Sequence, residues 1–148
     1  MASATAAAVS VWARTPTDVH LVADDGLSHF DGATFTHGGA LPYEVHATDR
    51  GPSALYLIAT PDGGGGPELV RFDGSAFARV ADSDREYTEL RVVRDDDVWA
   101  FSSFGGGVGH YDGDSFTADA FFGAGAPYGM SGSAPDNVWA VDDSGAMF

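Results

Sequence analysis

The stretch HFDGATF (29–35) returns as RFDGSAF (71–77) and as HYDGDSF (110–116). In each copy an Asp-Gly step follows an aromatic residue and precedes a Phe three positions beyond the Gly. Asp-Gly between two short alternating segments predicts a β-hairpin, because both residues tolerate the positive φ that a two-residue type I′ turn requires. The aspartates are separated by 73 − 31 = 42 and 112 − 73 = 39 residues, which indicates an internal repeat.

A second hairpin unit precedes each Asp-Gly motif and occurs once more near the end of the chain. Its copies are VSVWARTPTDVHLVA (9–23), EVHATDRGPSALYLIA (44–59), LRVVRDDDVWAF (90–101) and YGMSGSAPDNVWAV (128–141). Their second segments carry an aligned ring residue: His20, Tyr56, Trp99 or Trp139. Two hairpins per period give four short antiparallel strands, the strand count of a propeller blade. Gly or Pro interrupts every segment with helical spacing, so we predict an all-β fold with essentially no helix.

We therefore expect one β-propeller or partial propeller over residues 1–148, with about four blade equivalents. The expected blade units are 9–43, 44–89, 90–127 and 128–148, and the last is incomplete. Residues 2–8 could supply the missing strand and close the ring, which would remove an unpaired sheet edge. Three arrangements stay open: a four-bladed ring in one chain, an eight-bladed ring from two chains that exchange ends, and a piece of a longer propeller.

The chain is strongly acidic, with 22 acidic residues, seven arginines, no lysine and a net charge of −15. This charge repels phosphate backbones and anionic lipids, so we expect neither nucleic acid nor membrane surfaces as partners. Cations, cationic proteins and neutral ligands remain. Without cysteine there are no disulfides or thiolate sites. Neither an apolar run of membrane-spanning length nor a signal peptide is visible, so we expect a soluble protein of undetermined compartment.

Residues 132–141 (GSAPDNVWAV), 95–101 (DDDVWAF) and 29–35 (HFDGATF) resemble the tandem repeat of bacterial β-propellers with Asp-Val-Trp-Ala-Val and aromatic-Asp-Gly blade motifs. These are akin to kelch-like and tectonin-like propellers, and the resemblance covers nearly all of 9–148. It implies a propeller fold but no particular function, because propellers host many functions. The chain departs from the pattern at His20 and Tyr56, where Trp is usual, and at the final Phe of each Asp-Gly motif.

The repeated aromatic residues are the candidate ligand-binding residues: Trp99, Trp139 and Tyr56, together with Trp12 on the first strand. Such residues either fill the space between blades or form a stacking platform for sugars. The five histidines show no His-x-His or His-x-x-x-His spacing, so we predict no histidine metal site. A weak calcium site at Asp95, Asp96 and Asp97 is the remaining metal hypothesis, against solvated turn carboxylates with Asp97 bonded to its own turn.

The sequence shows no catalytic residues and implies no cofactor. It lacks Gly-x-Ser-x-Gly, and GGGG (63–66) lacks the Lys-Ser/Thr of a phosphate loop and reads as an exposed hairpin tip. We therefore predict a non-catalytic module that presents loops to a protein or glycan, with 48–53, 60–67 and 121–127 as the contact loops. The alternatives are a subunit that self-assembles by strand exchange into a ring or filament, a lectin that uses inter-blade aromatic residues, and, last, a hydrolase-type propeller.

Overall fold

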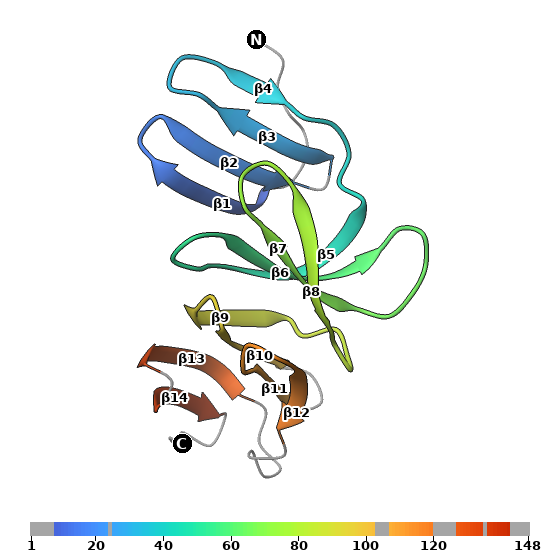
Figure 1. Ribbon diagram of the computed structural model, residues 1–148, viewed down its shortest axis with the longest axis vertical. Helices are drawn as coiled ribbons and strands as arrows, with labels where there is room; N and C mark the ends of the chain where they lie inside the picture. The colour runs from blue at the N-terminus through green and yellow to red at the C-terminus, as the bar shows by residue number, and fades with distance from the viewer. Residues whose placement is uncertain (1–7, 24, 103–106, 120–126, 135, 143–148) are drawn as a thin grey trace. The chain divides into compact units, whose positions relative to one another are not determined.

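The computed structural model describes residues 8–23, 25–102, 107–119, 127–134 and 136–142 (Figure 1). Every helix or strand in these ranges is a β-strand, which confirms the prediction of an all-β fold. The strands form three four-stranded antiparallel sheets and one two-stranded sheet, called blades 1 to 4 in chain order. Two compact units divide the chain, Met1–Glu44 and Val45–Phe148. No helix in the described ranges is long and apolar enough to cross a bilayer.

Blade 1 belongs to the first unit and follows the chain in a simple meander. Its strands are β1 (Ala8–Thr15), β2 (Asp18–Ala23), β3 (Gly26–Phe30) and β4 (Phe35–His37), paired in that order. The register places Trp12 opposite His20 and His20 opposite His29. Three ring side chains from three neighbouring strands therefore lie in one row across the sheet.

The second unit contains blades 2, 3 and 4. Blade 2 consists of β5 (Tyr43–Arg50), which begins two residues before the unit does, β6 (Leu55–Pro61), β7 (Glu68–Phe72) and β8 (Phe77–Asp82). Blade 3 consists of β9 (Glu89–Arg94), β10 (Asp97–Ser102), β11 (Gly107–Tyr111) and β12 (Phe116–Asp119). Blade 4 has β13 (Pro127–Ala134) and β14 (Asn137–Asp142).

The core of the second unit lies between blades 2 and 3. It joins residues of β6, such as Tyr56 and Ile58, to residues of β9 and β10, such as Leu90 and Val98. Tyr56 is 1% exposed and Ile58 is fully buried, so blade 2 hides its apolar face by packing on blade 3.

The prediction of type I′ turns with positive φ at both Asp and Gly is wrong: the aspartate is the first residue of a four-residue turn, and only the glycine that follows it has positive φ. Hairpin β3–β4 is closed by the pair Phe30 and Phe35, so residues 31–34 form the turn. The Asp31 carboxylate accepts hydrogen bonds from the backbone N–H groups of Ala33 and Thr34, both at 2.9 Å. No described residue other than glycine has positive φ, and Gly32 alone supplies it in this turn, at 96°.

The same turn recurs in blades 2 and 3. Asp73 and Asp112 each accept two backbone N–H hydrogen bonds from the second and third residues that follow them, at 2.8 to 3.0 Å. These bonds stabilise the ionised carboxylate and lower its pKa, in Asp73 to about 2 with the Ser75 hydroxyl as the largest cause. The aspartate thus closes the hairpin with its side chain.

Blade 4 shows two strands within the described residues. The predicted closing strand, residues 2–8, lies outside the described residues except for Ala8. Ala8 pairs with Ala23 inside blade 1. Closure of a ring by the first residues stays a prediction.

Candidate functional site

A polar residue begins the second strand of three blades, and a ring side chain follows it two positions later. These pairs are Asp18 with His20, Asp97 with Trp99, and Asn137 with Trp139. In blades 1 and 3 a histidine on the next strand lies directly opposite the ring residue. We call the resulting three-residue group, an aspartate and two rings, the ring triplet.

The ring triplet of blade 3 is Asp97, Trp99 and His110. The Oδ1 atom of Asp97 accepts hydrogen bonds from Trp99 Nε1 at 3.0 Å and from His110 Nε2 at 2.7 Å. The two rings stack with centroids 3.9 Å apart and an interplanar angle of 15°. Asp97 is 2% exposed, so a buried carboxylate here fixes two rings rather than facing solvent.

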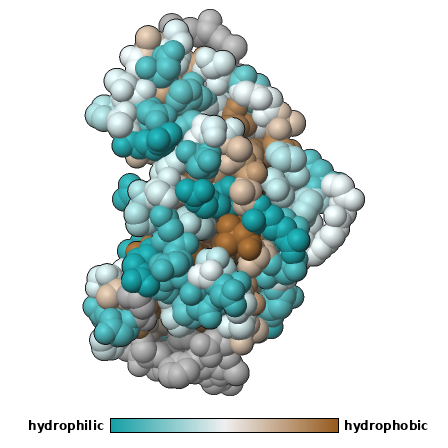
Figure 2. All heavy atoms as spheres, in the orientation of Figure 1, coloured by the Kyte–Doolittle hydropathy of each residue, from teal (hydrophilic) through white to brown (hydrophobic). Residues whose placement is uncertain are grey.

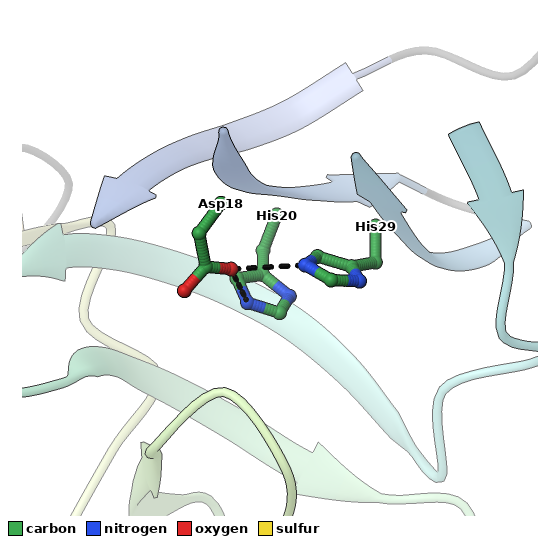
Figure 3. Close-up of side chains that lie close together, drawn as sticks. All are labelled: Asp18, His20 and His29. Carbon is green, nitrogen blue, oxygen red and sulfur yellow. Dashed lines mark hydrogen bonds and ion pairs between the residues drawn. The ribbon is translucent and has the colours of Figure 1, made fainter. Parts of the chain in front are cut away.

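The ring triplet of blade 1 is Asp18, His20 and His29 (Figure 3). Asp18 Oδ1 lies 3.1 Å from His20 Nε2 and 2.9 Å from His29 Nε2, and the imidazoles stack at 4.5 Å. The hydrogen bond from His29 holds the pKa of Asp18 below its ordinary value. Burial, aided by repulsion from His29, lowers the pKa of His20. These three residues can offer ligand atoms to a metal ion.

Blade 2 replaces the triplet with a group that reaches the neighbouring blade. The Tyr56 hydroxyl donates to the backbone carbonyl of Asp95 at 3.0 Å and lies 3.3 Å from its Oδ1 atom. Ser53 donates to Asp95 Oδ2 at 2.6 Å, and Arg71 donates to the Ser53 hydroxyl. Burial, reinforced by the Asp95 carboxylate, raises the pKa of Tyr56 to about 12. This group ties the β5–β6 turn to blade 3.

The four candidate ligand-binding residues lie on four different sheets. Tyr56 and Trp12 are buried at 1% and 4% exposure, and Trp99 is half-buried against His110. Trp139 is 54% exposed. Burial suits the packing role for Tyr56 and Trp12, whereas Trp139 retains a ring face open to a ligand. Their role in ligand binding stays a prediction.

The three carboxylates of the calcium hypothesis point to different partners. The Asp95 carboxylate accepts hydrogen bonds from Ser53 and Tyr56, Asp96 pairs with Arg94 at 3.1 Å, and Asp97 belongs to the blade 3 triplet. The interpretation of Asp97 as a solvated turn carboxylate is wrong, because the residue is 2% exposed and its partners are ring N–H groups of β10 and β11. A calcium site at these residues stays a prediction without a converged donor set in the described part of the chain.

Of the three contact loops expected from the sequence, one is confirmed as an exposed tip. Residues 62–66 are exposed between β6 and β7. In contrast, residues 48–50 belong to strand β5, and the Asp49 carboxylate accepts a hydrogen bond from Val92 N at 2.8 Å. Residues 121–126 lie outside the described residues.

Blade 4 carries three exposed apolar side chains, Tyr128, Trp139 and Val141 at 69%, 54% and 39% exposure, which we call the blade 4 surface. Trp139 and Val141 lie two positions apart on β14 and so share one face of that strand. The residues of blade 2 that align with Trp139 and Val141 are Tyr56 and Ile58, both buried against blade 3. Asn137 Oδ1 accepts a hydrogen bond from Trp139 Nε1 at 2.6 Å, which orients the indole. The face of β14 that carries Trp139 and Val141 is therefore open to solvent, whereas the equivalent face of β6 packs on blade 3.

One face of the molecule is mostly polar. Hydrophilic residues cover most of the face seen in Figure 2, and hydrophobic residues occur there in smaller patches. This agrees with a net charge of −15.

Comparison with known proteins shows the fold. No family model and no curated protein sequence matches the chain. Among solved structures it is similar to YCF48 bound to D1 peptide, with a TM-score of 0.54 and 10% sequence identity. The match covers 97% of this chain and 62% of that one, so the chain spans less than two thirds of its length. YCF48 is a β-propeller, and the four-stranded antiparallel sheets agree with it: the chain has a β-propeller fold.

Proposed function

We propose that this chain is a non-catalytic, protein-binding module of the β-propeller class. The observation that carries the proposal is the blade 4 surface, where Trp139 and Val141 are exposed although their counterparts in blade 2 are buried. Exposed aromatic and aliphatic side chains on a rigid sheet are typical anchors of protein interfaces. The similar propeller YCF48 was solved with a bound peptide, which supports the same class of ligand here.

The charge of the chain favours a cationic ligand. With a net charge of −15, long-range attraction speeds the approach of basic segments and disfavours acidic ones. The indole of Trp139 also offers its face to a guanidinium or ammonium group. Because Asn137 already orients that indole, little side-chain entropy is lost on binding. The favoured ligand is a basic peptide segment with an apolar anchor.

The test is a set of fluorescent peptides of graded net charge, each with one leucine or aromatic anchor, measured by anisotropy. We expect basic peptides to bind, binding to weaken with salt, and Trp139→Ala to weaken it by about 30-fold, the size of an interface hot spot. The control is Val11→Ser, which removes an exposed apolar residue of blade 1 and should leave binding unchanged. Equal binding by wild type and Trp139→Ala, or no preference for basic peptides, would refute the proposal.

Self-assembly is the second candidate, and one observation favours it. Val11 on β1 is 58% exposed, so the first blade also shows an apolar residue to solvent. In this version the blade 4 surface of one copy packs on β1 of another. Light scattering separates the two functions: self-assembly gives a mass above 15.3 kDa that both Val11→Ser and Trp139→Ala reduce. A lectin function predicts instead that a glycan array shows hits lost in Trp99→Ala or Trp139→Ala.

The division into blade units 9–43, 44–89, 90–127 and 128–148, completed by 2–8, belongs to the same proposal. So does membership of the bacterial Asp-Val-Trp repeat type, which rests on the motifs at 95–101 and 132–141. Deletion of residues 2–8 tests the completion of the last unit. A lowered melting temperature supports it, and unchanged stability refutes it.

A further inference from the structure

We propose that Asp18, His20 and His29 form a binding site for a divalent transition-metal ion, and that zinc fits it best. The site goes beyond protein binding and uses residues that the proposed peptide surface does not. It lies entirely within blade 1, on strands β2 and β3.

The three side chains converge on one point (Figure 3). One ligand atom from each lies within 4.8 Å of the others, and the shortest separations are 2.9 and 3.1 Å, both to Asp18 Oδ1. Zinc binds imidazole nitrogen and carboxylate oxygen at about 2.0 to 2.2 Å, which places tetrahedral ligand atoms roughly 3.3 Å apart. A widening of a few tenths of an ångström, together with a turn of one ring, therefore turns the hydrogen-bonded cluster into a three-ligand zinc site with a fourth position for water.

One ring must turn for both imidazoles to bind the ion. A histidine nitrogen binds metal in the plane of its ring, and the two rings now stack with an interplanar angle of 17°. His29 can make this movement because its side chain is 42% exposed. His20 is 3% exposed and stacks on Trp12, so it is the fixed ligand. Asp18 and His20 are thus already in place, and the exposed His29 completes the ligand set when its ring turns.

Arg14 orients the carboxylate ligand, and the net charge of the chain attracts cations. Arg14 Nε lies 3.4 Å from Asp18 Oδ2, so the arginine contacts the outer carboxylate oxygen and leaves Oδ1 facing the histidines. Outer contacts of this kind fix the orientation of ligands in metal sites. The charge of −15 raises the local concentration of cations around the chain.

Blade 3 explains why the cluster differs from an ordinary repeat position. It has the same aspartate and the same stacked histidine, but Trp99 stands where blade 1 has His20. An indole N–H can donate a hydrogen bond to the carboxylate but cannot bind a metal ion. Within the described residues, the replacement of Trp by His therefore makes a metal-binding donor set in blade 1 alone.

The test uses zinc and the His20→Trp variant of the full chain. Titration calorimetry should show one zinc ion per wild-type chain with a dissociation constant in the micromolar range or tighter, and zinc should raise the melting temperature. His20→Trp places in blade 1 the residue that blade 3 carries at the equivalent position, Trp99. The fold should therefore survive, as circular dichroism would show. We expect it and His29→Ala to weaken zinc binding at least about tenfold, the lower limit for loss of even an outer contact.

Two further variants distinguish a specific site from loose binding by surface carboxylates. His110→Ala removes a histidine that also contacts an aspartate, and it should leave zinc affinity unchanged. Trp99→His gives blade 3 the donor set of blade 1 and should add a second zinc ion. Cobalt is a second probe, because bound nitrogen ligands change its visible absorption. Wild-type affinity in His20→Trp, or equal losses in His110→Ala and His29→Ala, would overturn the proposal.

Discussion

Replacing Asp97 by alanine should strongly destabilise the fold. The change leaves two ring N–H groups without their acceptor, since Asp97 Oδ1 takes hydrogen bonds at 3.0 Å from Trp99 and 2.7 Å from His110. A hydrogen bond to a carboxylate contributes about 1.5 to 3 kcal/mol. Trp99 is half-buried and the His110 side chain is 26% exposed, so water partly replaces the acceptor and the lower value applies. We expect a total loss of about 3 kcal/mol.

Urea denaturation followed by tryptophan fluorescence measures this loss, with Asp96→Ala as the matched control. Asp96 is adjacent in sequence and equally acidic, but it makes an exposed ion pair with Arg94 that contributes at most about 1 kcal/mol. The melting temperature should fall by roughly 6 to 12 °C in Asp97→Ala. Asp97→Asn keeps one acceptor oxygen and should lie between the two. Equal losses for Asp97→Ala and Asp96→Ala would refute the role of the ring triplet.

Three further outcomes are expected. Gly109→Ala should cost about 1 to 3 kcal/mol in urea denaturation, because its Cβ would lie 2.4 Å from an aromatic ring carbon, whereas Gly63→Ala meets nothing within 4 Å and should be neutral. The pKa of Asp73 is lowered to about 2, so its ionised carboxylate stabilises the fold above the unfolded pKa near 4, and this stabilisation is lost as the pH falls towards 2. NMR titration of the Asp73 carboxyl carbon should show a midpoint near 2. A midpoint near 4 would contradict the capped turn. Tyr56→Ala should cost about 3 to 5 kcal/mol as a buried aromatic and Trp139→Ala under about 1 kcal/mol, so similar losses would show that Trp139 is covered.

The architecture could be predicted from the sequence because the repeat is visible without any structure. The Asp-Gly motifs at 29–35, 71–77 and 110–116 each coincide with a hairpin, and each set of four strands forms one sheet. The turn type could not be predicted in the same way. A type I′ turn and a carboxylate-capped turn of four residues use the same Asp-Gly pair, and only the cross-strand pairing distinguishes them.

The ring triplets were missed because their members are distant in the chain. His20 and His29 become neighbours only through the β2–β3 register, so a search for histidines at short spacing passes over them. A usable signal exists in hindsight. A polar residue two positions before the aligned ring residue, as in Asp18 or Asp97, combined with a histidine at the start of the Asp-Gly motif, identifies the triplet from sequence.

The capped Asp-Gly turns also restrict where the blades can differ from one another. Residues 31–34, 73–76 and 112–115 all have the same length, because any insertion would separate an aspartate from the two N–H groups that it holds. The connections at the opposite end of the same sheets, 24–25, 62–67 and 103–106, span two, six and four residues. In each of these sheets the Asp-Gly connection thus has a constant length and the connection before it a variable one, so new loop sequences for engineered recognition belong in the latter, beginning with 62–66.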